Sequence, residues 1–207
     1  ITYSLEETSV PQGYTVSCVN RKDESGVDID NDFIVANIKA TSVSGSLIWE
    51  DSDDADGRRP VYVSVNLMKQ VGSGEVKQID SKRIVPEENG TWPGYSWDDL
   101  PMYDVDGTPV TYSVTMDNIS DYSYRAEGFN LVCIHERAKI NVSVRWDWQD
   151  SGDPEGIRPT SVTVKLLANG NDTGESIDFS GNSWSFSFND RYRFGAGSHG
   201  TQISYTV

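Results

Sequence analysis

The chain has 207 residues, and its 32 acidic and 17 basic residues give a formal net charge of −15 at pH 7. A phosphate backbone is held by clustered lysine and arginine, and none cluster here, so the composition argues against nucleic-acid binding. No stretch reaches the roughly 20 apolar residues of a membrane-spanning helix, so we expect no membrane insertion in this segment. Gly, Ser, Thr, Val, Tyr and Asp dominate without a 3.6-residue apolar period, which favours an all-β protein.

Two similar acidic loops divide the chain. The first, WEDSDDADGRRP, covers residues 49–60, and the second, WDWQDSGDPEGIRP, covers 146–159. Each is followed by alternating apolar and polar residues, a pattern that is typical of a strand with one buried face. With the loops in register, GTPVTYSV at 107–114 matches GTQISYTV at 200–207, and ITYSL at 1–5 has the same pattern. The repeat is roughly 100 residues long, the size of a β-sandwich domain.

In this register the sequence predicts one complete unit, residues 40–137, with an incomplete unit on either side. Residues 1–39 would supply the last strands of an upstream unit, and residues 138–207 the first strands of a downstream one. Turn signals such as Asp106-Gly107 separate the strands of the complete unit. We expect these strands near residues 42–49, 61–69, 75–85, 92–98, 109–117, 121–126 and 129–136.

The order of these motifs resembles the B-type repeat of the collagen-binding adhesin Cna. The motifs are a Trp followed by acids, Gly-x-Arg-Pro, an alternating strand, YSWDDLPMYD at 95–104 and VTYSV at 110–114. The resemblance covers nearly the whole chain as parts of three tandem units. It implies tandem prealbumin-like or inverse immunoglobulin-like β-sandwiches, with about seven strands per complete unit. It also implies an extracellular stalk on Gram-positive bacteria, anchored to the cell wall through regions outside this chain.

Many units of that family carry a self-formed isopeptide bond between a Lys on the first strand and an Asn or Asp on the last, promoted by a buried acid. Burial favours the neutral, nucleophilic amine and the protonated carboxyl, which makes this chemistry reasonable. In the complete unit the three family positions are Leu47, Met116 and His135, and the Lys position of the downstream unit is Val144. We therefore expect no catalytic set in the complete unit.

In the upstream part, Glu7 and Asn37 still match the family's acid and its Asn, and they are candidate remnants of an isopeptide site. Their Lys would lie before residue 1. The alternative is a strand-end acid and an Asn at a domain junction. Lys139 lies an odd number of residues from Val144, so it is expected on the opposite strand face and is rejected as the missing nucleophile.

The first acidic loop invites a metal interpretation. An EF-hand needs an acid where Ser52 stands and a Glu where Val63 stands, so that interpretation fails. A looser Ca²⁺ site from Asp51, Asp53 and Asp56 is a weak candidate, and a solvated turn before a strand is favoured over it. We expect no cofactor otherwise. The two histidines suggest no metal cluster and no nucleophile has a recognisable setting, so we expect no enzyme.

The sequence therefore predicts a structural stalk or spacer. The alternative is an adhesive module that binds a glycan or a host matrix protein, for example through an aromatic platform of Trp92 and Trp97. Because Cys18 and Cys133 fall in different repeats, we expect no disulfide between them. The incomplete units also suggest head-to-tail self-association, in which the N-terminal strands of one molecule complete the C-terminal half-domain of another. The alternative is that the boundaries are accidents of cleavage.

Overall fold

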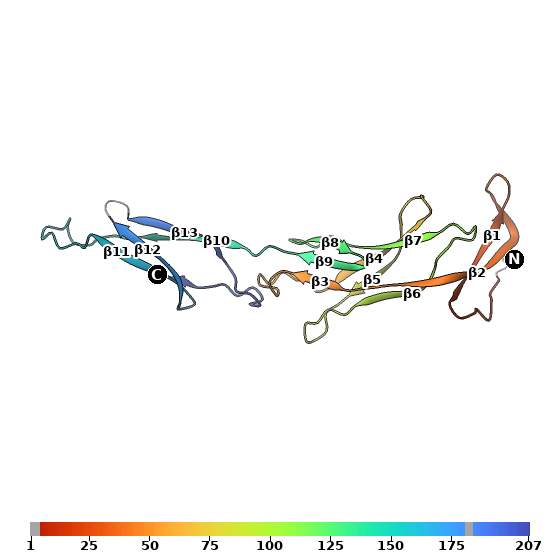
Figure 1. The fold of residues 1–207 in the computed structure, drawn as a ribbon, viewed down its shortest axis with the longest axis horizontal. Helices are drawn as coiled ribbons and strands as arrows, with labels where there is room; N and C mark the ends of the chain where they lie inside the picture. Colours follow the sequence, from red (N-terminus) through yellow and green to blue (C-terminus); the bar gives the residue numbers. More distant parts are fainter. Residues whose placement is uncertain (1–4, 181–183) are drawn as a thin grey trace. The chain divides into compact units, whose positions relative to one another are not determined.

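The protein is built of β-strands joined by turns and loops (Figure 1). The computed structural model describes residues 5–180 and 184–207, and in this part of the chain there is no helix, so none that could cross a membrane. Residues 1–4 of the strand expected at 1–5 lie outside the described residues. The strands are β1 Tyr14–Lys22, β2 Asp28–Gly45, β3 Leu47–Glu50, β4 Val63–Val71, β5 Lys77–Ile84, β6 Tyr95–Pro101, β7 Val110–Met116, β8 Ser123–Glu127, β9 Asn130–Ile134, β10 Lys139–Arg145, β11 Ser161–Ala168, β12 Asn171–Ser180, β13 Ser185–Tyr192 and β14 Tyr205–Thr206.

The chain divides into two compact units. Unit 1 comprises Ile1–Trp49 and Pro60–Ile134, and unit 2 comprises Glu50–Arg59 and His135–Val207. The first acidic loop therefore belongs to unit 2, although the sequence places it inside the complete repeat. The three-part division at 39/40 and 137/138 stays a prediction.

Unit 1 contains three small antiparallel or mixed sheets, in the strand orders β5-β4-β7, β3-β9-β8 and β1-β2-β6. The alternation expected after the first acidic loop is confirmed, because Val63, Val65 and Leu67 of β4 are at most 1% exposed. Leu131 and Cys133 of β9 are fully buried in the same core. This core requires β4 and β9 to place alternate side chains on one face, which is what strand geometry imposes.

Strand β2 is continuous across the position where the sequence suggested a boundary between repeats. Over residues 28–39 it pairs with β1, and over residues 40–45 it pairs with β6 on its other edge. A register shift between Thr41 and Val43 marks the change. The strand expected at 42–49 is thus the end of β2 followed by β3.

Trp97 lies in the core of unit 1 and is only 6% exposed. Its Nε1 donates a hydrogen bond of 2.8 Å to Asp80, and Trp92 packs against the same core. Core packing of these tryptophans, which the sequence favours over an aromatic platform, is therefore what the structure has, because the Trp97 ring is buried and is not presented to a ligand.

Unit 2 has a smaller core. Its strands form a β10-β13 pair and a β12-β11-β14 sheet. Leu166 is fully buried, and Val144, Val164, Phe179 and Phe188 surround it at 7% exposure or less. Val144, where the sequence analysis places the family's Lys position, is therefore a core residue of this unit.

Candidate functional site

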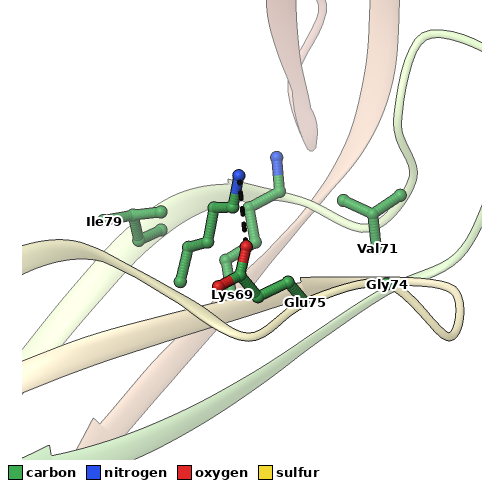
Figure 2. A pocket seen from close by; sticks show the side chains of 6 residues that line it. Lys69, Val71, Gly74, Glu75 and Ile79 are labelled. Carbon is green, nitrogen blue, oxygen red and sulfur yellow. Dashed lines mark ion pairs between the residues drawn. The ribbon is translucent and has the colours of Figure 1, made fainter.

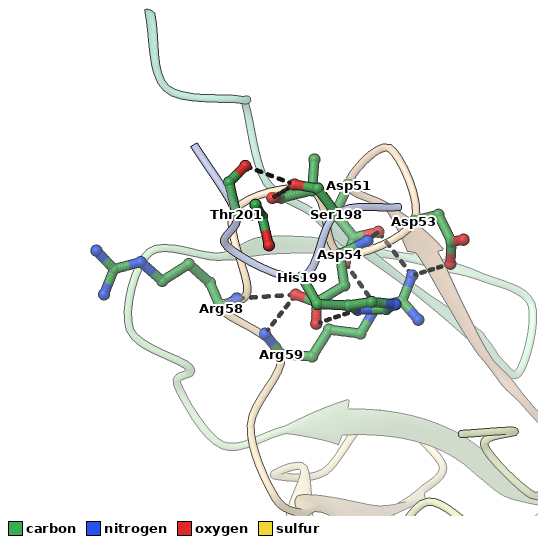
Figure 3. A network of polar contacts seen from close by, with 9 residues as sticks. Asp51, Asp53, Asp54, Arg58, Arg59, Ser198, His199 and Thr201 are labelled. Carbon is green, nitrogen blue, oxygen red and sulfur yellow. Dashed lines mark hydrogen bonds and ion pairs between the residues drawn. The ribbon is translucent and has the colours of Figure 1, made fainter. Parts of the chain in front are cut away.

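The first acidic loop has an internal frame built on two aspartates. Asp51 accepts hydrogen bonds from Nε and Nη2 of Arg59, both at 2.8 Å, and its side chain is fully buried. Asp54 Oδ1 accepts the backbone N–H groups of Arg58 and Arg59 at 2.8 and 3.0 Å (Figure 3). The hydrogen bonds that Arg59 donates to Asp51 raise the pKa of the Arg59 guanidinium further above its usual value. The two hydrogen bonds between Arg59 and Asp51, which we call the Asp–Arg fork, hold the loop in a compact turn together with the bonds to Asp54.

The loop is bound to residues 195–201 of unit 2 mainly through its backbone. Ser52 O accepts the N–H of Gly197, and Ala55 O accepts the N–H of Gly200, both at 3.0 Å. The Ser198 hydroxyl also donates to Ala55 O at 3.1 Å, and Asp54 Oδ2 lies 3.3 Å from Nδ1 of His199 (Figure 3). Ala55 is fully buried by these contacts. Buried backbone carbonyls need hydrogen-bond donors, and residues 195–201 supply them to the carbonyls of Ser52 and Ala55.

Gly57 is required at its position for two reasons. Its φ of 64° lies in the left-handed region, which disfavours side chains. A Cβ there would also lie 2.9 Å from the backbone carbon and oxygen of His199. The close approach of the two backbones therefore depends on this glycine.

Asp56 joins the loop to the segment that leads into β10. Its Oδ2 accepts the N–H of Ala138 at 2.8 Å and lies 3.1 Å from Nε2 of His135. The Asp56 side chain is 4% exposed and that of His135 is 13% exposed. Arg137 donates to the carbonyl of Phe194 beside them. The loop, residues 135–138 and residues 194–201 thus form one bonded cluster, which we call the clasp.

The second acidic loop has the same internal frame. Arg158 donates to both carboxylate oxygens of Asp150, and Asp153 Oδ1 accepts the N–H groups of Ile157 and Arg158. The hydrogen bond from Arg158 holds the pKa of Asp150 at about 2. Unlike Asp51, however, Asp150 has a side chain that is 34% exposed, and nothing lies within 4 Å of a Cβ built on Gly156. Among the described residues, this loop has no counterpart of the clasp.

The three aspartates proposed as a weak Ca²⁺ site do not converge. Asp51 is bonded to Arg59, Asp56 to Ala138 and His135, and Asp53 lies 3.7 Å from Arg59 with an exposed side chain. Over residues 5–180 and 184–207, no group of three or more His, Cys, Asp or Glu residues has an arrangement that could hold a metal. The calcium site stays an untested prediction without support from this geometry.

Two of the three family positions for an isopeptide bond meet in the core of unit 1. Leu47 and Met116 are 7% and 6% exposed members of one cluster, and Cys133 Sγ lies 3.8 Å from Met116 Sδ. His135 is not brought to them, because it lies in the clasp. The last-strand residue beside Met116 is therefore Cys133, and the assignment of Leu47, Met116 and His135 to the family's positions stays a prediction.

The candidate remnants Glu7 and Asn37 are brought together, with Asn37 Nδ2 donating to Glu7 Oε1 at 3.1 Å. Asn37 pairs across the hairpin with Val16, as Cys133 pairs with Tyr124. Aligning FIVANI at 33–38 with FNLVCI at 129–134 gives the same equivalence of Asn37 and Cys133. That alignment is the signal that could have replaced His135 by Cys133.

A surface hollow of about 400 Å³ lies at the turn between β4 and β5 (Figure 2). Lys69, Val71 and Ile79 line it, with Glu75 and Lys77 paired at 3.7 Å. It contains no His, Cys or Ser, so the usual nucleophile and base pairs are absent from its described lining.

The fold and the clasp define a class of protein, namely a tandem array of small β-sandwich units. Strand β9 runs beside β3, with Leu131 N–H donating to Ser46 O at 3.0 Å and His135 N–H to Glu50 O at 3.1 Å. Residue numbers rise together along this pair, so the first and last strands of the repeat are parallel.

The chain belongs to the Cna protein B-type domain family, whose model matches residues 43–133 and 142–207. It is 32% identical over 209 residues to a collagen adhesin of Staphylococcus aureus, covering all of this chain and 16% of that protein. The prediction of all-β, tandem β-sandwich units of this family is confirmed.

Solved structures of B repeat units are also similar. A single B repeat unit of the S. aureus collagen-binding surface protein is 29% identical, covers 81% of this chain and 84% of that chain, and has a TM-score of 0.41. A structure of two such units is 27% identical and covers 97% of this chain and 50% of that chain, also at a TM-score of 0.41. The pilus adhesin SpaC from Lactobacillus rhamnosus GG is 13% identical, covers 81% of this chain and 21% of that chain, and has a TM-score of 0.34.

Proposed function

We propose that the chain is a structural spacer in the stalk of an extracellular adhesin, held at the cell wall by regions outside this segment. The observation that carries the proposal is the assignment of residues 50–59 to unit 2. The chain passes from one unit to the other at 49/50, at 59/60 and again at 134/135. Domains are usually connected through exposed linkers with few contacts, and here the loop is bonded into the clasp.

A spacer under tension benefits from this connectivity. Extending unit 2 away from residue 49 requires the clasp bonds of Ser52, Ala55 and Asp56 to break. Those bonds are buried, and a buried polar group left without a partner is costly, so they break together and not one at a time. Resistance to extension is therefore placed at the boundary of the unit, where a simple linker would yield first.

Single-molecule force spectroscopy tests the spacer function, with handles at the two ends of the chain. We expect discrete unfolding steps from both units, and a lower force for the unit 2 step after Asp56→Ala. A matched control is Glu155→Ala, the same truncation in the second loop at the position equivalent to Asp56. Smooth extension at low force, without unit 2 steps, would contradict the proposal.

The binding-module alternative is tested by titrating the chain against matrix proteins, including collagen, and against a glycan panel. A spacer is expected to bind none of them. Saturable binding to any one would favour the alternative, with the hollow of Figure 2 as the first place to substitute.

A further inference from the structure

Both histidines of the chain lie in the clasp, and each faces an aspartate of the first acidic loop. Nε2 of His135 lies 3.1 Å from Oδ2 of Asp56, and Nδ1 of His199 lies 3.3 Å from Oδ2 of Asp54 (Figure 3 draws the second pair). Histidine is the side chain whose charge ordinarily changes between about pH 5 and pH 8. The clasp therefore places the two side chains with this property directly against acids.

The two pairs differ in burial. The side chains of Asp56 and His135 are 4% and 13% exposed, whereas that of His199 is 65% exposed. Solvent screens an exposed ion pair, which therefore contributes little, but it screens a buried pair much less. A change in the charge of His135 therefore affects the clasp more than the same change at His199.

The carboxylate of Asp56 has fewer hydrogen bonds than a buried carboxylate needs. Its Oδ2 accepts the N–H of Ala138 at 2.8 Å, while its Oδ1 is buried and, within residues 5–180 and 184–207, has no hydrogen-bond partner. A buried charge is costly unless it is paired and hydrogen-bonded. Protonation of His135 supplies a cation at the same carboxylate, which offsets this cost.

Other charged groups lie on the elements that surround the two histidines. Those that are exposed to solvent, and so are screened, are Glu50, Asp53, Arg58, Glu136 and Arg193. Arg137 donates to the carbonyl of Phe194. Arg59 is paired with the buried Asp51. These two arginines therefore have partners of their own, and the side-chain contact of His135 with the first loop is made to a carboxylate.

We propose that the clasp is a pH-dependent fastening, in which protonation of His135 tightens its contact with Asp56 and holds unit 2 more firmly in mildly acidic than in mildly alkaline solution. The imidazolium has the buried carboxylate as its partner in the folded clasp, but it has no such partner in the unfolded chain. The folded state therefore binds more protons than the unfolded state, so this contribution to stability is lost as the pH rises. Such a pH dependence is a property of unit 2 and does not require that the chain act as a spacer.

Hydrogen exchange between about pH 5.5 and pH 8 tests the proposal in the unaltered chain and in His135→Gln, which keeps a hydrogen-bond donor but takes up no proton. Exchange rates in peptides that cover 50–59 and 195–201 are divided by the intrinsic rates at each pH, which gives protection factors. We expect the ratio of the protection factors, unaltered chain over variant, to be about tenfold higher at the acidic end, because hydrogen bonds between charged groups are the stronger ones. Acidification also relieves repulsion in a chain of net charge −15, and the ratio removes this general effect.

His199→Gln is the matched control, because it makes the same change at the exposed pair. Its ratio is expected to vary by about twofold at most over the same pH range. A ratio for His135→Gln that is constant with pH, or that falls on acidification, would overturn the proposal. An equal pH dependence for the two variants would overturn it as well.

Asp56→Asn is a second test, which also serves if His135→Gln fails to fold. The substitution removes the charge of the carboxylate but keeps an oxygen for the N–H of Ala138. We expect the ratio of the unaltered chain to Asp56→Asn to rise on acidification by the same factor as for His135→Gln. A ratio that does not rise would overturn the proposal. Such a failure leaves the spacer function standing, because the force measurement tests that function separately.

Discussion

Replacing Arg59 by alanine tests whether the frame of the first loop holds the clasp together. Asp51 is fully buried and bonded to Arg59 by two hydrogen bonds of 2.8 Å, so the substitution leaves a buried carboxylate without its cation. Removing one member of a buried ion pair costs about 3–5 kcal/mol. Because the Arg59 side chain retains 19% exposure, we expect the lower end, about 3 kcal/mol, for the free energy of opening of unit 2.

Hydrogen exchange followed by mass spectrometry measures this loss of stability separately in unit 1 and in unit 2. A destabilisation of about 3 kcal/mol speeds exchange roughly 100-fold in peptides that cover 50–59 and 195–201. Peptides from the core of unit 1, such as those covering β4, should be unchanged. The double variant Asp51→Ala, Arg59→Ala should recover part of the loss, because it removes the buried charge as well.

The second loop supplies the matched control for this prediction. Arg158→Ala breaks the same fork, but Asp150 is one third exposed and stays hydrated after the loss. Exposed ion pairs contribute little, so we expect a much smaller acceleration around residues 147–158. Equal effects of the two substitutions would refute the argument from burial. No effect of Arg59→Ala would show that the clasp is held by its backbone bonds alone.

Three further outcomes follow from the same geometry. In chemical denaturation, Gly57→Ala should destabilise unit 2 more than Gly156→Ala. Both substitutions cost about 1 kcal/mol because φ is positive, but only at Gly57 would the new Cβ lie 2.9 Å from backbone atoms. Equal losses of stability would contradict the close approach of the two backbones. The pKa of Asp150 is lowered from 3.8 to about 2, so its pair with Arg158 stabilises the protein fully above pH 3.8. This contribution is lost as the pH falls through 2. An NMR titration of the Asp150 carboxyl carbon with a midpoint near 3.8 would contradict this prediction. The intact mass should equal that of the plain sequence, because Leu47 and Val144 stand at the family's Lys positions; a mass lower by ammonia or water would reveal an isopeptide bond.

The strands could be predicted from the sequence because their signals are local. The alternation of Val63, Val65 and Leu67 with polar neighbours sets the buried face of β4 without reference to any partner. The duplicated loops then fixed the repeat, and all seven segments expected in the complete unit overlap observed strands; six have ends that differ by a few residues, and the segment at 42–49 is divided between the end of the longer β2 and β3. Such end shifts are expected where hydrogen bonding, and not composition, defines the boundary.

The clasp and the third family position could not be predicted in the same way. The sequence predicts a solvated turn because the acids of the loop are polar, yet Asp51 and Asp56 are buried, and the partners of Asp56 are His135 and Ala138, far away in sequence. His135 was predicted from the family resemblance alone, and the structure places it beside Asp56 and not beside Met116. In a strand, side chains alternate between faces, so Cys133 and not its neighbour Ile134 can meet Met116.

A comparison of the two acidic loops shows which features of the clasp are set by the loop's own sequence and which depend on a distant segment. Both copies read Asp-x-x-Asp-x-x-Gly-x-Arg, at 51–59 and at 150–158, and both form the Asp–Arg fork and the left-handed turn. The first copy is bonded to residues 195–201, and within residues 5–180 and 184–207 the second copy has no such partner segment, so the frame does not depend on that contact. Its conformational entropy is therefore lost when the loop folds, before any docking, and docking gains from a preorganised surface. By this reasoning the internal frame of each loop is set by its own sequence, and the burial of Asp51 and Asp56 depends in addition on the contacts of the clasp.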